Sequence, residues 1–180
     1  MTNASRRFGR FHEDDVVTEP LNDTIDPENF TPRLLALLSN ALVWRESQEM
    51  LRRFDLGTND WRVLSALGLR PGASATEVSD FLGVNKAVVS KSVNRLVGRH
   101  LIVLIDGPRG SRPMFLTREG AQMHGEMLPV SLGGHEIITS DMSDAEVDQL
   151  NELLRTMLWR LRTSQLLDAE LALDAEASAS

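Results

Sequence analysis

Cysteine is absent from this chain of 180 residues, which excludes disulfide bonds, thiol redox sensing and cysteine-based zinc sites. No apolar run reaches the roughly eighteen residues that a membrane-spanning helix needs. The N-terminus carries Arg6, Arg7 and Arg10, but no apolar segment follows them, so we predict no secretory signal. These absences predict a cytoplasmic protein that makes no membrane contact.

Patterns typical of catalysis and metal binding are also missing. The sequence has no nucleophile–base motif and no glycine-rich phosphate loop, and its histidines are not at ligand spacing: His12, His100, His124 and His135. We therefore expect no catalytic residues, no metal and no cofactor.

Charge is unevenly distributed along the chain. The net charge of the whole chain is −7, yet residues 84–118 carry seven basic side chains and a single carboxylate, Asp106, which gives this segment +6 and the remainder −13. A basic island in an acidic protein favours contact with nucleic acid, whereas a merely solvated basic face is the alternative.

Periodicity and turn residues predict a mainly α protein with a small β-hairpin. Residues 1–29 are polar and predict a flexible arm, and Thr31-Pro32 predicts a helix start with Thr31 as the cap. That helix ends near Phe54, and Thr58 is expected to cap a shorter one. Residues 168–180, rich in Ala, Glu, Asp and Ser, predict a disordered tail.

The segment 74–120 predicts a winged helix-turn-helix. Ser74 and Glu77 form a capping box for a helix expected to bury Val78, Phe81 and Leu82, and Gly83 supplies the turn. Asn85 caps the next helix, whose buried stripe is expected to be Val89, Val93, Leu96 and Val97. Strands at 101–105 and 114–116 flank a loop of glycine, proline and arginine.

The outward face of the second helix of this motif has the residue types that read DNA. Short polar side chains can approach base edges, and basic ones reach phosphates or guanine. Helix starts offer free N–H groups to phosphates, and arginines on the hairpin loop suit the minor groove. The predicted DNA-binding residues are Ser74, Thr76, Asn85, Lys86, Ala87, Ser90, Lys91, Asn94, Arg95, Arg109 and Arg112.

Each piece also has a purely structural interpretation. Ser74 can simply cap a helix, Arg95 and Arg99 can pair with acidic neighbours, and the loop arginines can be solvated. The alternative function at this level is a winged-helix protein–protein interaction module that does not read DNA. Together, however, the capped helix, the glycine turn and the two basic surfaces favour DNA.

In the order and spacing of its motifs, residues 30–166 resemble the MarR (multiple antibiotic resistance regulator) family of bacterial transcription factors. The resemblance rests on Leu-x-x-x-x-Trp-Arg-Val-Leu at 56–64, Val-Ser-Lys-Ser-Val-Asn-Arg-Leu-Val at 89–97, and the frame of Leu-Ile at 101–102 and Leu-Thr-x-x-Gly at 116–120. It implies dimerisation helices at 30–56 and 118–167 around a winged domain at 57–117. It further implies a homodimer that represses neighbouring genes at a pseudo-palindromic operator and is released by a small molecule, often phenolic or aromatic.

The sequence departs from this family pattern in the wing. Pro108 stands where an acidic residue usually precedes the wing arginine, so Asp106 is a substitute partner and either Arg109 or Arg112 is the groove residue. His100 occupies a position where glycine is common. The N-terminal arm is longer than the family pattern requires.

The resemblance also places an effector pocket between the dimerisation helices and the winged domain. Its candidate lining residues are Trp44, Arg45, Gln48, Trp61 and His124. An arginine near two tryptophans suits an anionic aromatic ligand. The alternative is that both tryptophans belong to the hydrophobic core.

Overall fold

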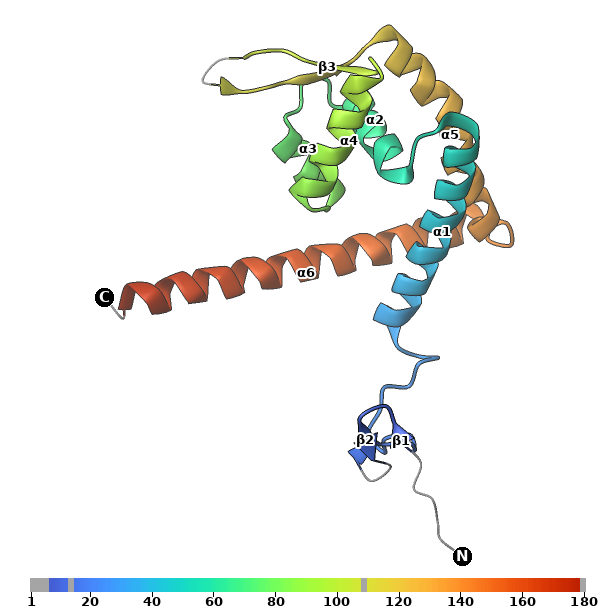
Figure 1. Ribbon diagram of the computed structural model, residues 1–180, viewed down its shortest axis with the longest axis vertical. Helices are drawn as coiled ribbons and strands as arrows, with labels where there is room; N and C mark the ends of the chain where they lie inside the picture. Colours follow the sequence, from blue (N-terminus) through green and yellow to red (C-terminus); the bar gives the residue numbers. More distant parts are fainter. Residues whose placement is uncertain (1–6, 13–14, 108–109, 179–180) are drawn as a thin grey trace, which may run out of the picture. The chain divides into compact units, whose positions relative to one another are not determined.

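A computed structural model describes residues 7–12, 15–107 and 110–178 of the chain (Figure 1). It confirms a mainly helical winged helix-turn-helix fold. The elements of the winged domain are α2 (Thr58–Leu69), α3 (Ala75–Leu82), α4 (Lys86–Gly98), β3 (Ile102–Leu104) and β4 (Met114–Leu116). They are preceded by α1 (Thr31–Phe54) and followed by α5 (Arg118–Thr139) and α6 (Asp144–Ser178). The chain separates into two compact units, 1–41 and 42–180, with the boundary inside α1.

The N-terminal unit contains a hairpin that the sequence did not predict. Strands β1 (Arg7–Phe8) and β2 (Phe11–His12) pair antiparallel, with Arg7 opposite His12. Gly9 at the turn has φ +65°, in the left-handed region that glycine adopts without strain. Strands of two residues are too short for hydrophobic alternation to reveal them.

The N-cap residues of α1 and α2 each lie one position before the predicted residue. The carbonyl oxygen of Phe30 accepts the Leu34 N–H at 3.2 Å, so Phe30 is the cap of α1 and Thr31 is its first residue. Likewise Gly57 caps α2, and the Asp60 carboxylate accepts the Gly57 N–H at 2.9 Å. The prediction of Thr31 and Thr58 as caps is therefore wrong, and at α2 the Asp60 carboxylate binds the backbone N–H of the cap residue instead.

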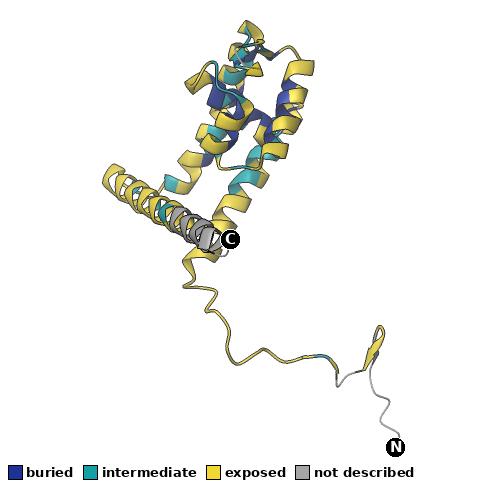
Figure 2. Cartoon of the chain, turned by 90° about the vertical axis from the view of Figure 1, so that its left-hand side faces the viewer, coloured by how far each residue is buried: buried dark blue, intermediate teal, exposed yellow. Residues whose placement is uncertain are grey.

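Helix α2 lies at the centre of the winged domain, where it packs against α3, α4, α5 and β4. The dark blue segments in Figure 2 mark these buried surfaces, while α6 is almost entirely exposed over its described residues. The core joins apolar side chains from every element of the domain and from the end of α1, including Met50, Leu56, Trp61, Leu64, Leu67, Val78, Val89, Leu96, Leu101, Met114 and Met127.

Two side chains predicted to be buried in the helix-turn-helix are exposed. Phe81 lies under the Arg70 guanidinium at 4.3 Å from its ring centre instead of in the core. Val97 lies at the edge of the buried face of α4. The helix turns Ser92, rather than Val97, toward the core beside Val89 and Leu96.

The wing is an antiparallel pair in the predicted place. Ile102 pairs with Leu116 and Leu104 with Met114. His100, just before β3, has φ +58°, a conformation in which glycine carries no steric penalty. This backbone geometry accounts for the glycine common at this position in the family pattern. The His100 carbonyl accepts a hydrogen bond from the Thr117 hydroxyl at 2.8 Å, which joins the start of the wing to the cap of α5.

The last two helices are longer than predicted. Helix α5 runs through Pro129 and through the Gly133-Gly134 pair, although such residues commonly interrupt or end a helix. Gly134 is buried, and a Cβ there would make an ordinary van der Waals contact with Leu42 of α1 at 3.6 Å, so α5 faces α1 at this position instead of breaking. Helix α6 starts at a capping box formed by Ser143 and Glu146 and continues to Ser178, beyond the expected end at residue 167.

Within the described part of the chain, no helix is long and apolar enough to cross a membrane.

Candidate nucleic-acid interface

Helix α4 separates its side chains into a buried face and an exposed basic face. Val89, Ser92, Val93 and Leu96 are buried against the domain. All the predicted reading residues of the helix are exposed, namely Lys86, Ala87, Ser90, Lys91 and Asn94. Both lysines of the entire chain therefore lie on this one face. We call these five residues the reading face.

The turn before α4 fixes the orientation of the reading face. Gly83 adopts φ +63°, and the buried Ser79 hydroxyl donates to the Val84 carbonyl at 2.7 Å. The Asn85 side chain accepts the Ala87 N–H at 2.8 Å and so caps α4 as predicted. The glycine and the two side-chain hydrogen bonds thus set the angle between α3 and α4.

The start of α3 is already occupied by a carboxylate. Glu77 accepts hydrogen bonds at 2.7 Å from both the Ser74 N–H and the Ser74 hydroxyl, which confirms the capping box. These hydrogen bonds, backbone first, lower the pKa of Glu77, with the Arg70 charge adding to the effect. A phosphate at Ser74 would have to displace this carboxylate, whereas Thr76 is exposed and its side chain makes no hydrogen bond within the described part of the chain.

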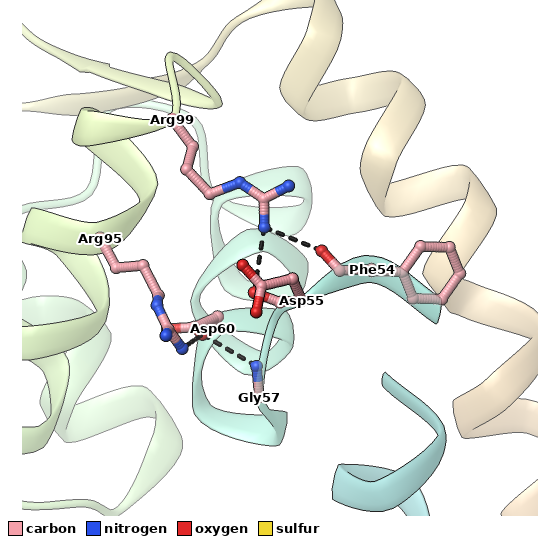
Figure 3. A network of polar contacts seen from close by, with 6 residues as sticks. All are labelled: Phe54, Asp55, Gly57, Asp60, Arg95 and Arg99. Carbon is pink, nitrogen blue, oxygen red and sulfur yellow. Dashed lines mark hydrogen bonds and ion pairs between the residues drawn. The ribbon is translucent and has the colours of Figure 1, made fainter. Parts of the chain in front are cut away.

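Arg95 and Arg99 attach α4 to the turn between α1 and α2 (Figure 3). Arg95 Nη1 lies 3.3 Å from Asp60 Oδ2, and Asp60 is only 5% exposed. Arg99 Nη1 donates to the carbonyl oxygens of Phe54 at 2.8 Å and Asp55 at 3.0 Å. Arg95 thus pairs with an acidic neighbour, as its structural interpretation expected, whereas Arg99 binds backbone carbonyl oxygens rather than a carboxylate. Arg95 keeps its predicted place beside the reading face, but its guanidinium is already paired.

Asp60→Asn is expected to lower the free energy of unfolding by about 1–2 kcal/mol. Asparagine can still accept the Gly57 N–H, so the loss reports the Arg95 ion pair, and the partial exposure of Arg95 keeps that loss below the value for a fully buried pair. Urea denaturation measures it. Glu49→Gln is the matched control, because the Glu49–Arg52 pair at 2.7 Å is exposed and should leave the midpoint unchanged. Equal midpoints for both variants would contradict an anchoring role for Asp60.

The wing supplies one described arginine. Arg112 is exposed on the loop between β3 and β4. Arg109, the other predicted groove residue, and Pro108 lie outside the described residues. Among the residues that the structure describes, Asp106 makes no ion pair with Arg112. The assignment of the groove arginine thus stays a prediction.

The five candidate effector-site residues do not line a single cavity. Trp44, Arg45 and Gln48 line a cavity of about 310 Å³ between α1 and α5, and Trp44 is 69% exposed rather than in the core. Trp61 is a core residue that stacks on the His124 ring at 4.9 Å between ring centres.

Trp61 also lines a second cavity of about 330 Å³ between α1, α2 and α5. The polar residues of this cavity were missed by the sequence reasoning: Glu46, Arg62, Ser131 and His135. Arg62 follows Trp61 directly and Glu46 lies one turn before Met50, but neither position has a pattern that distinguishes a cavity wall from solvent.

In the described ranges, no three His, Asp or Glu side chains are placed to hold a metal ion.

The comparisons with known proteins agree with this geometry. The MarR family model matches residues 54–113, from the end of α1 to the wing loop. A curated relative, the HTH-type transcriptional regulator TcaR of Staphylococcus aureus (strain Newman), is 25% identical over 129 residues, which cover 69% of this chain and 84% of that protein.

Solved structures share the fold. A MarR/EmrR family regulator from Acinetobacter sp. ADP1 superposes with a TM-score of 0.72 at 24% identity, over 77% of this chain and 99% of that one. MepR of S. aureus, crystallised with DNA, gives a TM-score of 0.66 at 20% identity, over 74% of this chain and 98% of that one. The family match over residues 54–113, the relative and the shared fold point the same way, and together they support a winged-helix transcriptional regulator of the MarR family.

Proposed function

We propose that this regulator is a cytoplasmic repressor that binds a pseudo-palindromic operator as a homodimer, controls neighbouring genes and is released by a small anionic aromatic molecule. The observation that carries the proposal is the reading face, where both lysines of the chain stand exposed beside Ser90 and Asn94. The major groove admits one such helix, with short polar side chains against base edges and lysines on phosphates or guanine.

Exposed apolar side chains support the homodimer. Helix α6 exposes Leu150, Leu153 and Leu158, and α5 exposes Leu132 and Ile137. The first half of α1 does the same with Leu34, Leu35 and Leu38. Extended apolar surfaces of this kind mark interaction sites. A helix face that met only water would not repeat leucine in this way. A two-fold dimer presents two reading faces to half-sites about one helical turn apart.

The cavity lined by Trp44, Arg45 and Gln48 is the best-supported effector site. Its guanidinium and exposed indole suit a carboxylate on an aromatic ring. Because the cavity lies between α1 and α5, a ligand there would alter the packing of the helices that flank the winged domain.

Selection from a randomised duplex library tests the proposed function. We expect the selected duplexes to contain an inverted repeat and to bind two protein chains each. Benzoate or cinnamate should release the DNA at the concentrations that quench tryptophan fluorescence. Trp44→Phe keeps a ring at the exposed position and should remove most of the quenching, whereas Trp159→Phe, an exposed tryptophan on α6, should not. Recovery of no enriched sequence would favour the protein–protein interaction module, and DNA release without any quenching would reject this effector site.

A further inference from the structure

The chain separates its two kinds of basic side chain. Of its nineteen lysine and arginine residues, only Lys86 and Lys91 are lysines, and both belong to α4. The remaining basic residues are arginines, distributed along the chain from Arg6 to Arg162. Apart from the N-terminal amine, the primary amines of this protein are therefore confined to the reading face.

The fold makes no use of either lysine charge. Both side chains are exposed, and neither forms an ion pair in the described part of the chain. Arg95 and Arg99 of the same segment instead bind Asp60 and backbone carbonyl oxygens. Lys86 is the first residue of α4, where the positive end of the helix dipole disfavours a cation. Removal of the two lysine charges should therefore leave the domain folded.

Arginine would serve a contact with DNA at least as well as lysine. Its planar guanidinium binds phosphate or guanine through two parallel hydrogen bonds, whereas an ammonium acts as a point charge. Lysine has a chemical property that arginine lacks, because its deprotonated primary amine attacks acyl donors. Acylation converts the cation into a neutral amide, which no longer neutralises a phosphate. Because both lysines belong to α4, every acylated lysine removes a charge from the reading face.

The surroundings of the two lysines attract an anionic acyl donor. Helix α4 contains Lys86, Lys91 and Arg95 and no carboxylate. The one ion pair that α4 makes within the described residues joins Arg95 to Asp60, which leaves both lysine charges uncompensated. A surface with charges of one sign raises the local concentration of small ions of the opposite sign. An acyl phosphate has this negative charge on the group that leaves when the acyl group is transferred.

We propose that Lys86 and Lys91 are acylated by a small acyl phosphate and that this modification releases the regulator from DNA. The deprotonated lysine nitrogen attacks the carbonyl carbon of the acyl phosphate, and a carbon–nitrogen bond forms. The bond between that carbon and the bridging oxygen breaks, inorganic phosphate leaves with the bonding electrons, and the proton that the nitrogen loses goes to the solvent. The release from DNA rests on the proposed function, whereas the acylation does not.

Competition between amines in opposite surroundings tests the acylation without DNA. Gln149→Lys adds an amine at an exposed position of α6, between Glu146 and Glu152 on the same helix. The full chain is treated with acetyl phosphate at low salt, and peptide mass spectrometry follows each amine. Relative to the introduced amine, Lys86 and Lys91 should react several-fold faster with acetyl phosphate than with N-acetylimidazole, an uncharged donor, and high salt should abolish the difference. The same relative rates with both donors would overturn the inference.

A charge-preserving variant tests the release from DNA. Lys86→Arg, Lys91→Arg keeps both charges and removes both amines, so only its N-terminal amine can react. After treatment with acetyl phosphate, the parent protein should bind a selected duplex at least about a hundredfold more weakly, whereas the arginine variant should keep its affinity within about twofold. Circular dichroism should show the same folded state for both proteins, because neither lysine is part of the hydrophobic core.

The two measurements distinguish failure of the inference from failure of the proposed function. Unchanged DNA affinity in the acetylated parent protein, or an equal loss in the arginine variant, would overturn the inference. If the untreated protein binds no DNA, the proposed function fails, and the relative acylation rates alone decide whether the reading face is an acylation site.

Discussion

Gly120→Ala is expected to lower the free energy of unfolding by about 3 kcal/mol, at the upper end of the usual cost of overpacking a core. Gly120 is buried in the first turn of α5, and a Cβ added there would overlap the backbone carbonyl of Leu101. That carbonyl accepts the Thr117 N–H at 3.0 Å and the Thr117 hydroxyl at 3.2 Å. A shift that relieves the overlap therefore breaks the hydrogen bonds that join the wing to α5.

Urea denaturation followed by circular dichroism measures this loss. Gly125→Ala is the matched control on the same helix, because a Cβ at Gly125 meets no atom within 4 Å. Alanine in that open helical position should leave stability unchanged or raise it by up to about 1 kcal/mol. Similar denaturation midpoints for the two variants would contradict a steric role for Gly120.

The backbone contact at Gly120 also shows which parts of the fold a sequence can reveal. Features set by neighbouring residues were predicted correctly, such as the Ser74–Glu77 box, the Gly83 turn and the Asn85 cap. In each of them one side chain satisfies backbone groups within a few positions, so the residue types and their spacing contain the information.

Features that depend on contacts between distant residues could not be predicted. Asp60 and Arg95 are 35 positions apart, and only the packing of α2 on α4 brings them together. A pair of glycines such as Gly133-Gly134 lowers helix propensity, yet α5 continues through it beside Leu42 of α1, a tertiary contact that the local sequence does not reveal.

The candidate site divides in the same way. The exposure of the five residues of the reading face was predicted in full, because helical phase alone places them opposite a buried stripe. The phase did not resolve positions at the edge of the stripe, which is why Val97 was assigned to the core. The cavities needed two or three helices at once, and their polar residues show no periodic signal in the sequence.

The double variant Lys86→Ala, Lys91→Ala is expected to weaken DNA binding by at least about a hundredfold at moderate salt. Both lysines are exposed on α4, and a homodimer would lose four ammonium groups from its contact with DNA. If each ammonium neutralises one phosphate, the slope of log affinity against log salt should fall by about four. Neither side chain is part of the hydrophobic core, so the winged domain should keep its stability.

Fluorescence anisotropy over a series of salt concentrations measures both quantities on one selected duplex. Arg155→Ala, Arg160→Ala removes the same charge from exposed positions on α6, and its affinity and slope should match those of the parent protein. A comparable loss in both variants would mean that net charge, rather than the reading face, governs binding. An unchanged slope in the lysine variant would show that α4 does not touch the phosphates, and the exposed lysines would then have to serve a protein partner.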